Sequence, residues 1–241
     1  MRLVSWNIRG GKHPGVVTSL LALAPDVAVL VDCRANHVKR IITDAEKDGY
    51  VYHLNSPPSY TGIVMISKHP LANGRIEQPD VPQRWLHGVS DHFELEIAAV
   101  YGPLPKTIRE EPPMKAFWDW VVPACDLIVD RNAVLCGDFN TGVDEADGPP
   151  GYRYRGAIPF SALKAHGWMD AYRKLHAEGG QSWWHGERGF RIDHCMLSRC
   201  QPTATRAEYI KVEADAGTEM SRSTGVKLPA FPDHAALVVD F

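Results

Sequence analysis

Residues 133–140 read AVLCGDFN, an apolar run that ends in an acid and an amide. A short apolar run closed by turn-forming residues is typical of a strand buried on both faces. Strands of this kind, or with an alternating pattern, are predicted at residues 2–7, 26–31, 62–67, 92–101, 133–137, 189–198 and 235–241. Helices are predicted at residues 15–23, 36–48, 112–122, 159–166 and 170–176. Because strands and helices interleave throughout, the sequence predicts one layered α/β domain over residues 1–241.

Three polar segments interrupt this pattern. Residues 141–158 are rich in glycine, proline and charge, which predicts a long surface loop. Residues 213–230 are polar and broken, and they predict a second loop. Asp91 and His92 are interpreted as a turn that leads into the strand after them.

The composition is that of an ordinary globular protein, with 44% hydrophobic and 23% charged residues and a net charge of −3. The five cysteines are odd in number and form no C-x-x-C pair, which argues against a disulfide framework or a zinc site and favours the cytoplasm. The N-terminus lacks the layout of a signal peptide. No apolar run approaches the ~18 residues that span a membrane, so no membrane association is expected.

Polar side chains follow the apolar strands repeatedly. Asn7, Asp32 and Asp138 with Asn140 come at the ends of predicted strands. Asp193 with His194 lies within the strand predicted at 189–198, and Asp233 with His234 opens the last strand. Side chains at strand ends of α/β proteins converge at one rim of the sheet, where ligands bind. A cluster of Asp, Asn and His without Cys suits a hard cation such as Mg²⁺ or Mn²⁺.

The motifs, taken in order, resemble those of the endonuclease/exonuclease/phosphatase superfamily, in particular the exonuclease III-like apurinic endonucleases. The matching segments are LVSWNIRG at 3–10, PDVAVL at 25–30, GIVMISK at 62–68, AVYGP at 99–103, GDFN at 137–140, RID at 191–193 and DHA at 233–235. The resemblance covers nearly the whole chain. It implies a four-layer α/β sandwich, in which two packed mixed β-sheets are flanked by helices.

The same resemblance implies a role for each matching residue. Asp32 would hold the metal, with Asn7 and Asp233 close to it. The other residues would act in the attack on phosphate. Asp138 would accept a proton from water, and Asn140 would place the water or the phosphate. His234, oriented by Asp193, would stabilise the phosphoryl oxygens, and Tyr101 would contact the phosphate or the leaving group.

Three features depart from the family pattern. Asp32 stands where the family has glutamate, which is one methylene longer, so the metal would shift or a water would bridge. Leu104 stands where nuclease relatives have Asn or Gln, which removes one phosphate contact. The segment from Trp183 to Phe190 is short, so less protein would reach over a duplex.

The segment that carries Trp183, Phe190 and Ile192 resembles the pocket for a base-less sugar in apurinic endonucleases. The alternative is a plain hydrophobic core, to which Trp184 is expected to belong in either case. Arg9 and Arg188 are expected to grip phosphates. The expected partner is DNA, bound by a monomer.

Two other functions remain open. The same site could hydrolyse RNA or a small phosphorylated molecule as a phosphodiesterase or phosphatase. The chain could also be an inactive binding domain in which Asp32 no longer binds metal. The intact acid–histidine cluster argues against the inactive domain, because a charged cluster costs folding energy to desolvate.

Overall fold

The computed structural model describes residues 1–57, 60–104, 111–154, 157–201, 203–212 and 232–241. Two six-stranded mixed sheets form its centre. The first has the order β13 (Arg206–Ile210), β14 (Ala236–Asp240), β1 (Arg2–Gly10), β2 (Val27–Arg34), β4 (Thr61–Ser67) and β3 (Tyr52–Asn55). The second has the order β5 (Ala72–Asn73), β6 (Trp85–Ser90), β7 (Leu95–Tyr101), β8 (Ala133–Asp138), β12 (Asp193–Leu197) and β9 (Met169–Asp170).

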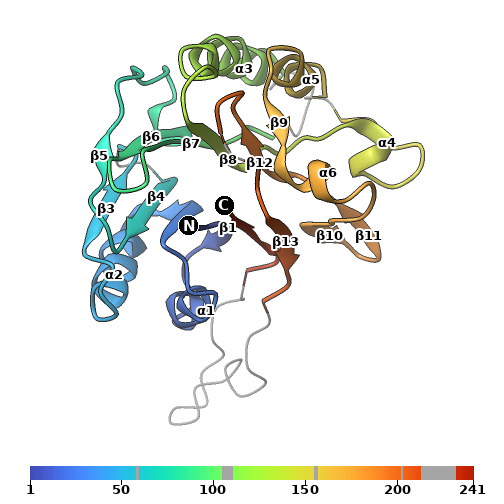
Figure 1. Ribbon diagram of the computed structural model, residues 1–241. Coiled ribbons are helices and arrows are strands. Elements are labelled where there is room, and N and C mark those ends of the chain that lie inside the picture. The colour runs from blue at the N-terminus through green and yellow to red at the C-terminus, as the bar shows by residue number, and fades with distance from the viewer. Residues whose placement is uncertain (58–59, 105–110, 155–156, 202, 213–231) are drawn as a thin grey trace.

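Helices cover the outer face of each sheet (Figure 1). Helices α1 (Val16–Ala22) and α2 (Ala35–Glu46) lie outside the first sheet, and α3 (Glu111–Asp126) and α5 (Ala157–Ala165) lie outside the second. The remaining elements are a hairpin of β10 (Trp183–His185) and β11 (Arg188–Phe190), the short helices α4 (Asp144–Asp147) and α6 (Ala171–Leu175), and a 3-10 turn, η1 (Pro82–Arg84). This arrangement confirms the predicted four-layer sandwich.

Three apolar clusters correspond to the three interfaces between the four layers. Leu3, Val29 and Val134 belong to the cluster between the two sheets. Leu30 packs with α1 and α2, and Leu135 packs with α3 and α5. Successive side chains of a strand point to opposite faces. A strand buried on both faces therefore has a continuous apolar sequence, which is why residues 133–137 could be recognised.

The structure corrects several predicted boundaries. The strand predicted at 92–101 begins at Leu95, because residues 91–94 form the turn expected around Asp91 and His92. The strand predicted at 189–198 is interrupted at residues 191–192, where the chain turns from β11 into β12. The predicted loop at 141–158 contains α4 and the start of α5. The loop predicted at 213–230 lies outside the described residues.

Some strands were not predicted from the sequence, and all of them except β6 are short or polar. They are β3, β5, β6, β9, β10 and β13. Trp184 is half-buried rather than part of the core, and Lys211 lies over its ring. In the part of the chain that the structure describes, no helix has the length and apolarity needed to cross a membrane.

Candidate functional site

One cavity of about 380 Å³ collects most of the residues predicted from the sequence. Its lining includes Asn7, Arg9, Asp32, Tyr101, Leu104, Asp138, Asn140, Trp183, Phe190, Ile192, Asp233 and His234. A second cavity, of about 470 Å³ between α2 and β3, is larger but contains none of the acid and histidine residues predicted at strand ends. We therefore place the site by its chemistry and not by its size.

Strand alternation explains why these side chains meet. In β8, Val134 and Cys136 face the core between the sheets, so Asp138 at the end of the strand faces the same way. Asn7 in β1, Tyr101 in β7 and Asp193 in β12 are placed by the same rule. In each strand, the side chain two residues away faces the core between the sheets or the rim of that core, so the polar side chain faces the same way. The site is thus the polar end of the interface between the two sheets.

Backbone irregularities aim three further side chains at the cavity. Arg9, Asp32 and Asn140 have φ angles of 48°, 52° and 51°, in the left-handed region that residues other than glycine rarely adopt. Asp32 lies in a register shift between Leu30 and Cys33, where β2 pairs with β4. Such strain and bulges are common at functional sites, because they redirect a side chain that regular pairing would place elsewhere.

Gly102 allows the ends of β7 and β8 to approach each other closely. Its N–H donates to the carbonyl of Asp138 over 2.7 Å, and a Cβ atom at this position would lie only 2.1 Å from the carbonyl oxygen of Phe139. The side-chain amide of Asn140 donates to the carbonyl of Gly102 over 2.8 Å. A side chain at position 102 would therefore separate Tyr101 from the loop that carries Asn140.

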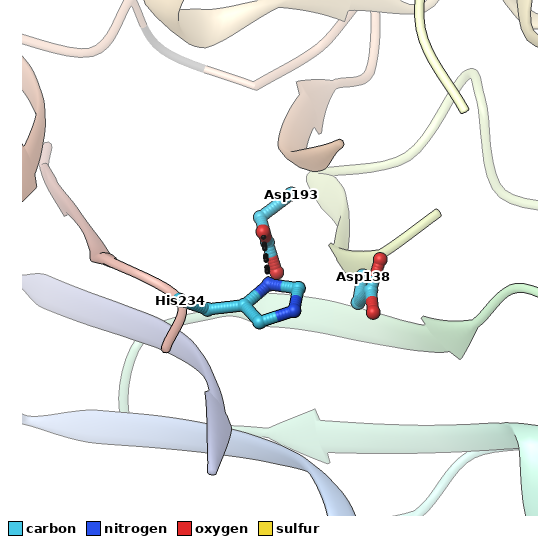
Figure 2. A group of neighbouring side chains, drawn as sticks. All are labelled: Asp138, Asp193 and His234. Carbon is cyan, nitrogen blue, oxygen red and sulfur yellow. Dashed lines mark hydrogen bonds and ion pairs between the residues drawn. The ribbon is translucent and has the colours of Figure 1, made fainter. Parts of the chain in front are cut away.

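His234 and Asp193 form a buried pair. The Nδ1 atom of His234 donates to Oδ2 of Asp193 over 2.8 Å, and the ring lies between Asp193 and Asp138 (Figure 2). The hydroxyl of Ser182 accepts from the backbone N–H of Asp193 over 3.1 Å, which fixes the start of β12. Burial lowers the pKa of His234, but the charge of Asp193 and its hydrogen bond outweigh burial and raise it to about 9. His234 is therefore a cation near neutral pH.

Asp138 is buried, with 1% of its surface exposed, and yet it is surrounded by hydrogen-bond donors. The side-chain amide of Asn7 donates to its Oδ2 atom over 2.9 Å, and the backbone N–H of Asn140 donates to its Oδ1 atom over 2.9 Å. Burial and the nearby charge of Asp193 raise the pKa of Asp138 to about 7, although His234 and the two donors oppose the shift. A carboxyl with this pKa is suited to exchanging protons at neutral pH.

Asp32 also lines the cavity and is hydrogen-bonded to Tyr101. Burial raises the pKa of Asp32, and burial together with the charges of Asp32 and Asp138 raises the pKa of Tyr101, so its hydroxyl keeps its proton. Arg84 fixes the position of Tyr101. Its guanidinium lies over the Tyr101 ring and donates to the carbonyl oxygens of Tyr101 and Gly102.

Two sets of side chains at this site could hold a metal. Asp138, Asp193 and His234 place their ligand atoms within 4.8 Å of one another. A protonated His234 is a poor ligand, however, because both ring nitrogens carry protons. Asp32, Asn7 and Asp233, the set expected from the sequence, line the same cavity and offer oxygen atoms that suit a hard cation. The thiol beside this set belongs to Cys33, whose pKa burial raises to about 12, so it offers no thiolate.

The aromatic side chains expected in a pocket do line the cavity. Phe190 and Ile192 are each 7% exposed and pack with Tyr154, and Trp183 packs against this group. These residues form a small apolar cluster whose surface faces the cavity, and their role as a pocket for a base-less sugar stays a prediction. Asp193 stands behind His234 and does not line it.

The two arginines expected to grip phosphate differ in position. Arg9 lines the cavity, with half of its side chain exposed, and its guanidinium lies 3.5 Å from Asp233. Arg188 is exposed at the start of β11 and is not part of the lining. A phosphate contact by Arg188 would have to lie outside the cavity.

Arg84, Tyr152 and Tyr154 were not predicted from the sequence. Arg84 lies in a 3-10 turn without any motif of its own, so nothing local indicates its role. Tyr152 and Tyr154 line the cavity from the segment GPPGYRYRG, residues 148–156, which was predicted only as a loop. The tyrosines two residues apart were the available signal, because large aromatic side chains are uncommon in a solvated loop.

Comparisons with known proteins agree with this fold. A family model described as "Endonuclease/Exonuclease/phosphatase family" matches residues 4–215. The fold is similar to a 3′-5′ exonuclease, NExo, of Neisseria meningitidis (20% identity, TM-score 0.78) and to an AP endonuclease of Archaeoglobus fulgidus (14% identity, TM-score 0.78). Each alignment covers 100% of this chain and 99% of the other. A further structure, described as a 3′ phosphatase NExo from Neisseria bound to a product DNA hairpin, has 19% identity and a TM-score of 0.78. No curated protein has a matching sequence.

Proposed function

Because the chain belongs to the endonuclease/exonuclease/phosphatase family, we propose that it hydrolyses phosphodiester bonds in DNA with a divalent metal ion, as an apurinic endonuclease, a 3′-exonuclease or both. The observation that carries the proposal is the arrangement of Asp138 and His234. A buried carboxyl whose pKa is about 7 and an imidazolium whose pKa is about 9 face one cavity. They supply a proton acceptor and a positive charge, which are what attack on an anionic phosphate requires.

The chain's own residues then divide the reaction among them. Asp138 accepts a proton from water as the water oxygen attacks phosphorus, and the bond to the leaving oxygen breaks in line with the attack. His234, held by Asp193, donates a hydrogen bond to the phosphoryl oxygens on which negative charge develops. Asn140 places the water or the phosphate, and Tyr101 contacts the phosphate or the leaving group.

Asp32, Asn7 and Asp233 would hold Mg²⁺ or Mn²⁺. Such an ion, when bound, supplies positive charge to the phosphate and to the leaving oxygen. The desolvated carboxylate of Asp32 supports this assignment, because burial raises its pKa and a cation would relieve the desolvation. Aspartate in place of glutamate shortens the reach of this ligand by one methylene, and the bulged backbone at Asp32 carries its side chain into the cavity.

DNA is the proposed substrate on two grounds. The apolar part of the cavity, which includes Trp183, Phe190 and Ile192, suits a sugar that has no base, and Arg9 lies near enough to contact a phosphate. The similar structures named above are described as an exonuclease, an AP endonuclease and a 3′ phosphatase. That the chain acts as a monomer in the cytoplasm stays a prediction.

A panel of five substrates tests the proposal: abasic duplex, intact duplex, single-stranded DNA, RNA and a small phosphodiester, each with Mg²⁺ or Mn²⁺. Abasic duplex or duplex 3′ ends should be cleaved, EDTA should stop the reaction, and Asp138→Asn should slow it roughly 10²-fold or more. Asp119→Asn, which alters an exposed aspartate on α3, is the matched control and should be as active as the wild type.

The alternative is hydrolysis of RNA or of a small phosphorylated molecule at the same site. Leu104, which is 58% exposed where nuclease relatives carry an amide, favours it, because one contact to a long nucleic acid is lost. Hydrolysis of RNA or the small phosphodiester without cleavage of any DNA would replace the proposal by this alternative. Hydrolysis of no substrate with either metal would favour an inactive binding domain.

A further inference from the structure

Ser182 is a fully buried residue that directly precedes Trp183 and the hairpin β10–β11. It does not line the cavity, and it was not predicted as a site residue. Its polar atoms nevertheless bond to the two chain segments that carry Asp193 and His234, the buried pair of the site. The side chains of this pair come from distant parts of the sequence, so a residue that contacts both segments can set their relative position.

The hydroxyl of Ser182 holds the backbone at the start of β12. Its oxygen accepts from the N–H of Ile192 over 3.0 Å and from the N–H of Asp193 over 3.1 Å. These two N–H groups lie where the chain passes from β11 to β12, and both residues are buried. Buried N–H groups need a partner, and here one hydroxyl serves two of them.

The carbonyl of Ser182 holds the chain beside His234. It accepts from the N–H of Ala235 over 2.7 Å, and the next residue, Trp183, forms a backbone bridge with His234 itself. The indole N–H of Trp6 donates to the carbonyl of His234 over 2.9 Å. The backbone that carries the imidazole is therefore fixed against β1 and against the segment of Ser182.

The carboxylate of Asp193 depends on its backbone for its orientation. Its Oδ2 atom accepts from His234 over 2.8 Å, and its Oδ1 atom has no hydrogen-bond partner among the residues that the structure describes. The carboxylate of Asp138, in contrast, accepts from both Asn7 and Asn140. A backbone shift at residue 193 would thus move the carboxylate relative to the imidazole, and no second bond to Oδ1 within the described ranges opposes that movement.

We propose that Ser182 is a positioning residue for the reaction at this site, because its hydroxyl places Asp193 and its carbonyl places His234. This inference rests on the proposed function, in which His234 stabilises the phosphoryl oxygens. Ser182→Ala leaves the N–H groups of Ile192 and Asp193 without their partner, so the backbone shifts to recover hydrogen bonds. Even a small displacement of a positioned group lowers the rate of the chemical step.

Ser198→Ala is the matched control for this substitution. Ser198 is also 0% exposed, and its hydroxyl accepts from the N–H groups of Ala133 and Gln201, each over 3.1 Å, at the opposite end of β12. Both variants should have lower melting temperatures than the wild type. Ser182→Ala should lower kcat on the DNA that the wild type cleaves best by about tenfold, with KM changed less than about twofold. Ser198→Ala should keep kcat within about twofold.

A second readout requires no cleavage. The Nδ1 proton of His234 is hydrogen-bonded to a carboxylate, so it should give a proton NMR signal far downfield of the backbone amides in the metal-free protein. The signal is identified by its absence in His234→Gln. In Ser182→Ala it should move upfield or exchange with water at least about tenfold faster, and in Ser198→Ala it should not change.

Ser182→Cys replaces Ser182→Ala if the alanine variant does not fold. The thiol fills the space of the hydroxyl but is a weaker acceptor, so kcat and the NMR signal should change in the same direction. An unchanged signal, or equal losses of kcat in the variants at positions 182 and 198, overturns the role of Ser182 and leaves the proposed function intact. A wild-type protein that cleaves none of the five substrates fails the proposed function, whereas the NMR comparison still decides whether Ser182 holds the pair.

Discussion

His234 donates a hydrogen bond from Nδ1 to Oδ2 of Asp193 over 2.8 Å, although the two residues are 41 positions apart in the sequence. The other oxygen of Asp193 is buried and has no hydrogen-bond partner within the described parts of the chain. The charge of Asp193 and its hydrogen bond raise the pKa of His234 to about 9, although burial alone would make this imidazole less basic.

Asp193→Asn should lower the activity. It should also make the activity decline at a lower alkaline pH than in the wild type. Removing the carboxylate removes the charge and the hydrogen bond that oppose burial most strongly, so the pKa of His234 drops from about 9. We expect a loss of kcat of roughly 10²-fold at pH 8, together with an alkaline limb displaced to lower pH. The pH profile of kcat measures this, and an unchanged limb would contradict the assignment of that limb to His234.

Asp138→Asn should remove the general base, with a loss of kcat of roughly 10²-fold or more. It should also change how stability depends on pH. The pKa of Asp138 is raised to about 7, so its ionisation destabilises the folded state as the pH rises from about 4 to about 7. The Asp138→Asn variant does not lose stability in this way, because asparagine does not ionise. The melting temperature of the variant, measured in EDTA, should therefore rise relative to that of the wild type as the pH increases over this range. If the two melting temperatures change with pH in the same way, the raised pKa of Asp138 is contradicted.

Asp32→Ala should raise the concentration of Mg²⁺ or Mn²⁺ needed for half-maximal activity by about tenfold or more, since it removes a charged oxygen ligand. Asp32→Glu should shift that concentration by a smaller factor, because the carboxylate is kept at a different reach. Metal titrations of activity, with calorimetric titration of the free protein, measure both effects. Identical metal dependence in all three proteins would mean that Asp32 is not a ligand.

Arg191→Met should destabilise the fold by about 3–5 kcal/mol, because it leaves the buried carboxylates of Asp147 and Asp170 without their main cation. Urea unfolding measures this loss. The control is Arg199→Met, which breaks an exposed pair with Asp130 and should change stability by less than about 1 kcal/mol. Equal effects of the two substitutions would contradict the structural role assigned to Arg191.

The sequence by itself determined most of the buried strands and most of the polar rim, whereas the four layers were implied by the resemblance to the family. Continuous apolar runs identify strands buried on both faces, and alternation along each strand is a local rule. The placement of Asn7, Tyr101, Asp138 and Asp193 on one face could therefore be anticipated once the strands were recognised. The order of the motifs along the chain indicated the family, which the family model confirms.

Only the tertiary structure decided the contacts that depend on how distant segments pack. The approach of Tyr152 to Phe190, the Asp147–Arg191 pair and the position of Arg84 behind Tyr101 join loops whose sequences carry no periodic pattern. The left-handed backbone at Asp32 likewise follows from a bulge between paired strands. Strand alternation acts between neighbouring residues, whereas these contacts come from the packing of whole elements, and a local sequence pattern does not encode that packing.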